Sequence, residues 1–243
     1  MKLFAYGPRG AERLAVLHQD TAYALDSLTS APAVDRSFLE QGGLDRVRTA
    51  LAQNTLPPLP VEQIDGVRRG AAVAPGKILC IGLNYRDHAR ETDAGIPTEP
   101  IVFMKAPDTV VGPDDEVLIP RGSQRTDWEV ELAVVIGSTL RYAASAEEAL
   151  QAVAGYAISN DVSERDFQLE RGGTWDKGKN CETFNPLGPY LVTADEVPDV
   201  QDLRLTLAVN GTTRQDGTTA DQIFPVGEVV RYLSQFMTLY PGD

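Results

Sequence analysis

The stretch Thr126-Asp127-Trp128-Glu129-Val130-Glu131-Leu132-Ala133-Val134-Val135-Ile136-Gly137 has the pattern of a β-strand that enters a buried core. Successive side chains of a strand point to opposite faces, so Asp127, Glu129 and Glu131 are expected on one face. Burying unpaired carboxylates is very costly. A hard divalent cation held by oxygen ligands would offset that cost, so the pattern predicts a metal site and an active site. The alternative is a partly solvated strand face.

Composition and charge limit the classes of protein that this chain can belong to. Its 243 residues are 42% hydrophobic, which is enough for a full core in one large domain or in two smaller ones. The 35 acidic side chains outnumber the 22 basic ones and give a net charge of −13, whereas nucleic-acid-binding proteins are usually basic. We therefore expect no nucleic-acid partner, and an anionic substrate would need Lys or Arg side chains close to it.

Cysteine content and hydropathy predict the compartment. Cys80 and Cys181 are the two cysteines, which give neither a disulfide framework nor zinc-ligand spacing, so both are expected to be reduced thiols. The N-terminal residues lack the apolar run of a signal peptide, and no apolar stretch is long enough to span a bilayer. These features predict a soluble, cytoplasmic protein with no membrane partner.

The order of elements predicts an α+β fold in which strands dominate. The composition changes at residues 71–75, which predicts a small N-terminal β/α domain over residues 1–72 and a larger domain over residues 73–243. Ser145 begins a Ser-x-x-Glu pattern, the capping box of a helix N-terminus. Two or three strands are expected before residue 27, and helices over residues 37–52, from Ser145 and over about 225–237. Further strands are expected over residues 77–82, 101–105, 116–119, 129–136, 155–160, 190–193 and 203–209.

Asp161 and the pair His88 and Glu91 could take part in the same chemistry. Asp161 ends a buried run and could complete a three-carboxylate site for Mg²⁺, Mn²⁺ or Ca²⁺, although a turn or helix-capping role is common for Asp. His88 and Glu91 lie three residues apart in an expected short helix, so they share one face. Such a pair can activate water, while the alternative for His88 is a cap or surface residue.

The segment Trp175-Asp176-Lys177-Gly178-Lys179-Asn180-Cys181 combines glycine with cations. Lys179 could stabilise negative charge on a carbonyl oxygen, and the alternative is a solvated loop. The sequence contains no phosphate-binding glycine motif and no Gly-x-Ser-x-Gly elbow, so neither nucleotide binding nor serine hydrolysis is predicted.

Taken together, these motifs resemble the fumarylacetoacetate hydrolase family. The resemblance runs in order from about residue 76 to the end of the chain. The matching segments are Ile81–His88, Phe103–Lys105, Asp127–Glu131, Asn160–Gln168, Trp175–Lys179, Pro186–Pro189 and the Val-Asn-Gly hairpin at 209–211.

The resemblance implies a mixed β-sheet roll enclosing a barrel-like core, assembled as a homodimer. It implies Mg²⁺ or Mn²⁺ held by Glu129, Glu131 and Asp161. It also implies water activation by His88 and Glu91, followed by a lid segment, and oxyanion stabilisation by Lys179. The matching positions in the substrate pocket are Arg165 and Gln168, with Lys105 in a matching strand.

The implied activity is hydrolysis of a carbon–carbon bond in a small anionic oxo acid, an acylpyruvate or a 2,4-diketo-3-deoxy sugar acid. An isomerase, oxaloacetate decarboxylase or ureidoglycolate lyase on the same metal site is an alternative, and so is a non-catalytic binder of metal or oxo acid. Family members usually continue past the final Leu239–Asp243 turn, so we expect the last strands of the family domain to be missing from this sequence.

Overall fold

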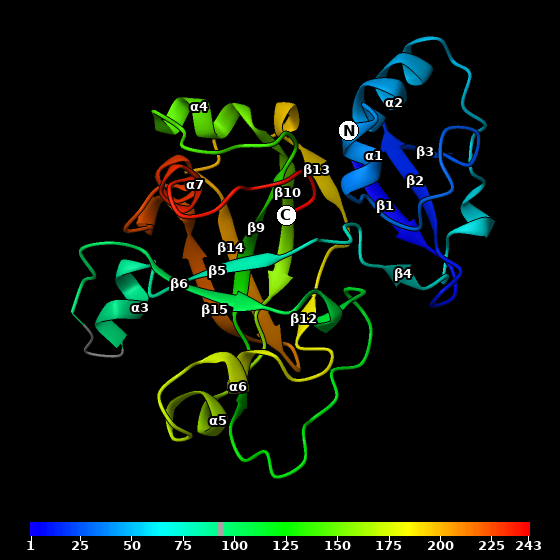
Figure 1. Ribbon diagram of the computed structural model, residues 1–243. Helices are drawn as coiled ribbons and strands as arrows, with labels where there is room; N and C mark the ends of the chain where they lie inside the picture. The colour runs from blue at the N-terminus through cyan, green and yellow to red at the C-terminus, as the bar shows by residue number, and fades with distance from the viewer. Residues whose placement is uncertain (92–94) are drawn as a thin grey trace.

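The largest sheet of the computed structural model joins the beginning of the chain to its middle (Figure 1). Residues 1–91 and 95–243 are described. This sheet has seven strands in the order β3-β2-β1-β13-β10-β9, and β4 pairs with β1 at its side. Its strands are β1 (Lys2–Tyr6), β2 (Arg13–His18), β3 (Thr21–Ala24), β4 (Arg69–Gly70), β9 (Val130–Ile136), β10 (Val153–Asn160) and β13 (Leu191–Thr193).

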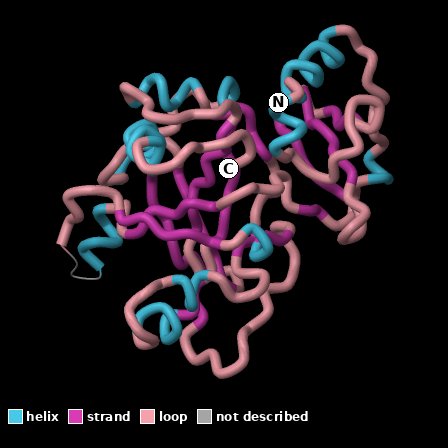
Figure 2. The backbone as a smooth tube through the Cα atoms, viewed as in Figure 1, coloured by secondary structure: helices cyan, strands magenta, loops and turns pink. Residues whose placement is uncertain are grey.

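Four two-stranded sheets surround the largest one, so the described residues form several small sheets and no closed barrel (Figure 2). This corrects the barrel-like core that the sequence led us to expect, while the strand-dominated α+β class is confirmed. The pairs are β5 (Ile78–Gly82) with β6 (Ile101–Lys105), β7 (Val110–Val111) with β12 (Asn185–Pro186), β8 (Thr126–Asp127) with β11 (Ser163–Glu164), and β14 (Arg204–Val209) with β15 (Thr212–Thr218).

Short helices connect and cover these strands. In Figure 1, α4 and α7 lie together above β9 and β10, whereas α5 and α6 lie at the opposite end of these strands. The α-helices are α1 (Arg36–Glu40), α2 (Gly43–Ala52), α3 (Arg86–Glu91), α4 (Ala146–Gln151), α5 (Arg165–Leu169), α6 (Asp176–Lys179) and α7 (Val226–Ser234). The 3₁₀ turns are η1 (Val61–Gln63), η2 (Pro107–Thr109), η3 (Ala194–Glu196) and η4 (Thr219–Asp221). None of the described helices is long and apolar enough to cross a membrane.

Of three hydrophobic clusters among the described residues, two pack helices against the largest sheet. One packs Val34, Phe38 and Val47 of the N-terminal region against buried residues of β1, β2 and β9, including Leu3 and Val135. The other packs α4 and α7 on the opposite face of β9 and β10. The β1–β13 pairing also carries the sheet from the N-terminal region into the part of the chain that follows residue 73. The boundary predicted at residues 72–73 stays a prediction.

Three predicted elements are wrong in detail. The helix expected over residues 37–52 is two helices, because Gly42 between them adopts the left-handed conformation with φ of 67°. The strand expected over 126–137 is interrupted at Trp128 and Glu129, which separate β8 from β9. Residues 116–119 form no strand, because no described segment supplies a hydrogen-bonding edge to them.

Candidate active site

Two neighbouring strands bring three carboxylates to one end of the sheet. β9 and β10 are antiparallel, with Glu131 opposite Ser159, so the start of β9 lies beside the end of β10. Glu129 precedes β9 and Asp161 follows β10, and the Asp161 amide donates to the Glu129 carbonyl oxygen at 2.9 Å. The alternation of the strand and the antiparallel pairing therefore place Glu129, Glu131 and Asp161 close together, as the sequence suggested.

Two buried lysines neutralise Asp161. Lys179 Nζ donates to Asp161 Oδ2 and to Glu129 Oε2, both at 2.8 Å. Lys105 Nζ donates to Asp161 Oδ1 at 2.7 Å and to the Val162 carbonyl oxygen at 3.2 Å. The side chains of Lys105 and Lys179 are only 1% and 2% exposed. Lysines are rarely this deeply buried unless they are paired, so these ion pairs are part of the site's architecture.

A third cation, Arg165, contacts the other side of the cluster. Its guanidinium lies 2.7 Å from Glu129 Oε1 and donates to Asp127 Oδ2 at 2.8 and 2.9 Å. It also donates to Gln168 Oε1 at 3.0 Å. Gln168, predicted as a substrate-binding residue, therefore joins the same network. The flat guanidinium can bridge several oxygens at once, which fixes the relative positions of Asp127 and Glu129.

Close packing of two short helices places Lys179. Gly178 in α6 lies against α5, and a Cβ atom there would come within 2.5 Å of the Glu164 carbonyl oxygen and within 2.6 Å of the Gln168 amide nitrogen. Any larger residue would push α6 away from α5. The glycine of the Lys-Gly-Lys motif is thus required for helix packing, which in turn directs the neighbouring Lys179 into the carboxylate cluster.

The electrostatics of the cluster differ from one carboxylate to the next. Burial tends to raise the pKa of Asp161, but the ion pairs with Lys179 and Lys105 outweigh it and hold that pKa below its ordinary value. Burial lowers the pKa of Lys105, whereas the carboxylates around Lys179 keep its pKa above the ordinary value despite burial. Burial, with repulsion from Glu129 and Asp161, raises the pKa of Glu131 to about 8.

Glu131 is the carboxylate that the protein itself leaves uncompensated. Among the described residues it has no hydrogen bond and no ion pair, and its remaining exposure is toward the cavity that it lines. A hard cation with oxygen ligands suits such a group. The described residues contain no group of three His, Cys, Asp or Glu side chains arranged to hold a metal ion as they stand. The donor chemistry nevertheless fits one, because each carboxylate oxygen that pairs with a lysine keeps a second lone pair.

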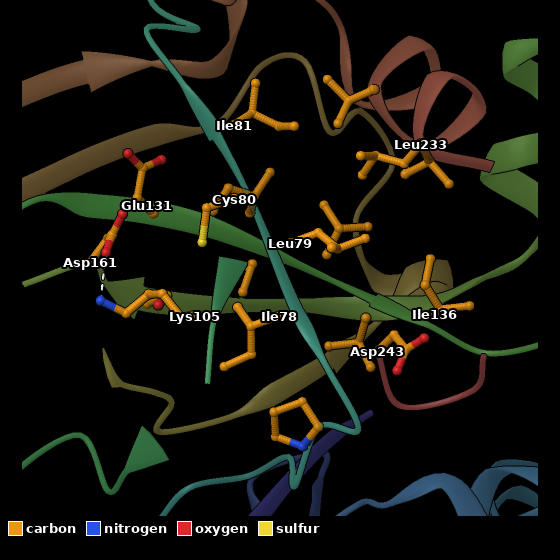
Figure 3. Close-up of a pocket in the computed structure, with 18 of the residues that line it drawn as sticks. Ile78, Leu79, Cys80, Ile81, Lys105, Glu131, Ile136, Asp161, Leu233 and Asp243 are labelled. Carbon is orange, nitrogen blue, oxygen red and sulfur yellow. Dashed lines mark hydrogen bonds and ion pairs between the residues drawn. The ribbon is translucent and has the colours of Figure 1, made fainter. Parts of the chain in front are cut away.

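The cluster closes one end of a cavity of about 200 Å³ between β5 and β9 (Figure 3). Glu131, Asp161 and Lys105 lie at one end of it, and Cys80 points into it from β5. Burial raises the pKa of the Cys80 thiol far above neutrality, so this sulfur is not a nucleophile. The rest of the lining is mostly apolar, from β5, β9 and α7. Asp243, which pairs with Lys77, lies at the other end, so the cavity has charged groups at both ends and an apolar middle.

His88 and Glu91 lie on α3, outside the cavity lining. His88 Nδ1 is 3.8 Å from Glu91 Oε2, and the two side chains are 47% and 79% exposed. Asn84 and Tyr85, which come just before α3, do line the cavity, so the helix begins at its edge. The structure therefore groups the other seven predicted site residues and places this pair apart from them. Residues 92–94, where the predicted lid begins, lie outside the described residues.

Sequence reasoning missed Glu164, which connects segments beside the site through hydrogen bonds. Its buried carboxylate accepts hydrogen bonds from the hydroxyls of Ser123 and Thr126 and from the backbone amides of Arg125 and Asp166. Burial tends to raise the pKa of Glu164, but these donors lower it overall. These hydrogen bonds join the loop before β8 to the start of α5. A carboxylate directly before a helix is a capping signal, which could have identified this residue from the sequence.

A comparison with known proteins agrees with this geometry. The model of the fumarylacetoacetate (FAA) hydrolase C-terminal domain matches residues 77–243, which contain every residue of the site. This chain belongs to the fumarylacetoacetate hydrolase family. The match begins at the residue just before β5, at the strand that forms one wall of the cavity.

Relatives and solved structures of this family span hydrolases and isomerases. A Burkholderia lata relative that carries the name "Putative hydrolase" is 48% identical over 244 residues, covering all of this chain and 84% of its own length. Fumarylacetoacetate hydrolase from Exiguobacterium antarcticum is 32% identical with a TM-score of 0.79, covering 100% of this chain and 84% of that one. A 2-hydroxyhepta-2,4-diene-1,7-dioate isomerase from Mycobacterium marinum is 30% identical with a TM-score of 0.75 and the same coverage. The family thus includes both kinds of enzyme, and its members generally use divalent metals.

Proposed function

We propose that this chain is a divalent-metal-dependent hydrolase that cleaves a carbon–carbon bond in 2,4-dioxo acids of the acylpyruvate or diketo-deoxy sugar acid type. The convergence of Glu129, Glu131 and Asp161 with Lys105 and Lys179 at one end of a cavity is the observation that carries the proposal. These three carboxylates would hold Mg²⁺ or Mn²⁺, which would polarise the substrate carbonyl and stabilise the charge that develops there.

The charge balance of the cluster supports an anionic substrate. Four carboxylates, those of Asp127, Glu129, Glu131 and Asp161, face three cations, so a divalent cation would leave one positive charge in excess. A substrate carboxylate would balance that charge, even though the whole chain is acidic. The apolar middle of the cavity would accept the rest of the substrate.

The protein's own side chains would have distinct roles. His88, held by Glu91, would take a proton from the attacking water, and the resulting hydroxide would add to the distal carbonyl carbon of the substrate. When the carbon–carbon bond breaks, the electron pair would pass to the leaving enolate, which would take up the proton that His88 holds. Lys179 would stabilise the oxyanion, and Arg165 with Gln168 would orient the substrate.

An isomerase is the second candidate, because solved isomerases resemble this chain as closely as the hydrolase does. An isomerase would use the same cluster to stabilise a dienolate while a proton moves from one carbon to another. No carbon–carbon bond would break and no water would be consumed, so the two reactions differ in their products.

The test is proton NMR of the purified chain with acetylpyruvate and Mg²⁺, with and without EDTA. The proposal predicts acetate and pyruvate in equal amounts, only with the metal, and their loss in Glu129→Gln. Glu182→Gln is the matched control, because Glu182 is exposed and lies outside the cluster. If acetylpyruvate and a diketo-deoxy sugar acid both remain intact with Mg²⁺ and with Mn²⁺, the hydrolase proposal is wrong. Double-bond migration in a 2-hydroxydiene-dioate would then favour the isomerase.

A further inference from the structure

Helix α3 has little packing of its own to hold it in place. It has six residues, of which only Ala89 is buried. Isolated helices of this length are not stable in water, so most of their stability must come from tertiary contacts. Since α3 carries His88 and Glu91, whatever fixes this helix also fixes the position of the proposed base.

Several hydrogen bonds to α3 and to the residue before it come from one distant segment, residues 221–224. Asp221 Oδ2 accepts a hydrogen bond from the Asp87 amide in the first turn of α3 at 2.8 Å. The carbonyl oxygens of Asp221 and Gln222 accept from Arg86 Nη1 at 3.3 and 2.7 Å. The first amides of a helix have no partner within it, and an Asp carboxylate is a preferred acceptor for them. Asp221 therefore supplies from 134 residues away the cap that usually comes from the preceding residue.

The residue before the helix is attached to the same segment. Asn84 Nδ2 donates to the Phe224 carbonyl oxygen at 3.0 Å, and the Phe224 amide donates to Asn84 Oδ1 at 2.9 Å. The Ile223 amide donates to the Asn84 carbonyl oxygen at 2.8 Å. These three hydrogen bonds set the point from which α3 starts, while Asp221 sets the direction in which it leaves.

The anchoring segment is itself rigidly held. Thr219, the first residue of η4, is fully buried. Its amide donates to the carbonyl oxygen of Leu203, the residue just before β14, and its hydroxyl accepts from the Leu203 amide. Gln201 Nε2 donates to the Thr219 carbonyl oxygen and to Gln222 Oε1, both at 3.0 Å, and the Val226 amide donates to Gln201 Oε1 at 2.7 Å. A carboxylate on such a segment can hold a weakly packed helix without moving itself.

We propose that Asp221 is a positioning residue, which orients the helix bearing His88 and Glu91 relative to the carboxylate cluster. Asp221 itself does not line the cavity, and its carboxylate accepts a hydrogen bond from α3, so its effect passes through this helix. The proposal rests on the proposed function for its catalytic consequence. Its structural part, that Asp221 holds α3, stands on the hydrogen bonds alone.

The test compares Asp221→Ala with Asp221→Asn, which keeps an oxygen that can accept from the Asp87 amide. Asp202→Ala is the matched control, because this aspartate is exposed and follows Gln201, which belongs to the same hydrogen-bond network. Amide hydrogen exchange over residues 84–91 is measured first. Exchange should be about five to ten times faster in Asp221→Ala and close to wild type in Asp221→Asn and Asp202→Ala. Unchanged exchange in Asp221→Ala would overturn the anchor.

Kinetics on a substrate that the wild type cleaves then test the catalytic part. Asp221→Ala should lower kcat about tenfold with little change in KM, and Asp221→Asn should restore most of kcat, because a misplaced base slows proton transfer but leaves substrate binding intact. If kcat is unchanged while His88→Ala is inactive, Asp221 is not a positioning residue. If His88→Ala is fully active, the assignment of the base fails, and the anchor is judged by exchange alone.

Discussion

The carboxylate cluster and helix α3 are built in opposite ways. The carboxylates of the cluster lie at the ends of the paired strands β9 and β10, and the side chains of Lys105 and Lys179 are 1% and 2% exposed. Helix α3 leaves the sheet after β5, and the side chain of His88 is 47% exposed. The position of the carboxylate cluster is therefore set by the core of the fold, whereas the position of α3 depends on a few hydrogen bonds near its N-terminal end.

This difference separates two demands of the proposed chemistry. Groups that bind charge need fixed positions and a low dielectric, since electrostatic interactions are strong only when the partners are already in place. A group that moves protons to and from water needs access to solvent. The cluster meets the first demand and α3 the second, so substitutions in the two regions should differ in size and in kind.

Asp161→Asn should have the largest effect. The side chain of Asp161 is 8% exposed and holds both Lys105 and Lys179, so the change leaves two buried ammonium groups poorly compensated. We expect the free energy of unfolding to fall by about 3–5 kcal/mol and activity to be lost. Urea denaturation measures the first, and Asp216→Asn, which breaks the exposed pair with Arg204, is the control and should leave the free energy of unfolding close to the wild-type value. Equal losses in the two variants would contradict the difference drawn between buried and exposed pairs.

Asn84→Ala should have the next largest effect, and it tests the base of α3. Asn84 is 8% exposed, and its removal leaves the amide and the carbonyl of Phe224 without their partner. We expect a loss of about 2–3 kcal/mol in the free energy of unfolding, with the fastest local exchange at residues 84–91. Chemical denaturation with hydrogen-exchange mass spectrometry measures both. A loss confined to the cluster, with α3 protected as in the wild type, would show that α3 is held by other contacts.

Glu131→Gln should make the metal-free protein more stable at high pH. The folded pKa of Glu131, about 8, lies above its ordinary value of 4.5, so ionising this carboxylate destabilises the folded state. The penalty is absent below pH 4.5, grows as the pH rises and is complete above about 8. In EDTA at pH 8.5 the variant should be more stable than the wild type, and at pH 4.5 the two should be equally stable. Thermal denaturation at the two pH values measures this, with Glu182→Gln, an exposed position outside the cluster, as the control.

The sequence predicted the cluster better than it predicted α3 and its anchor. Strand alternation and the apolar run at 132–136 are local signals, and they grouped Glu129 with Glu131, whereas the family resemblance added Asp161. The hydrogen bond from Asp87 to Asp221 spans 134 residues, and no local pattern encodes it. The break at Trp128 and Glu129 was missed for a related reason: β8 pairs with β11 rather than with β10, and pairing partners are a tertiary property.

Arg90→Ala should have the smallest effect, and it locates the anchor of α3 more exactly. Arg90 Nη2 lies 3.8 Å from Asp221 Oδ2, but its side chain is 75% exposed, so solvent screens most of this ion pair. The hydrogen bond from the Asp87 amide to the same carboxylate is 2.8 Å long and part-buried, and it does not depend on Arg90. We therefore expect stability, kcat and exchange over residues 84–91 to stay close to wild type. An effect of Arg90→Ala as large as that of Asp221→Ala would mean that charge, rather than the helix cap, holds α3, and the loss should then be reproduced in the wild type by 1 M salt.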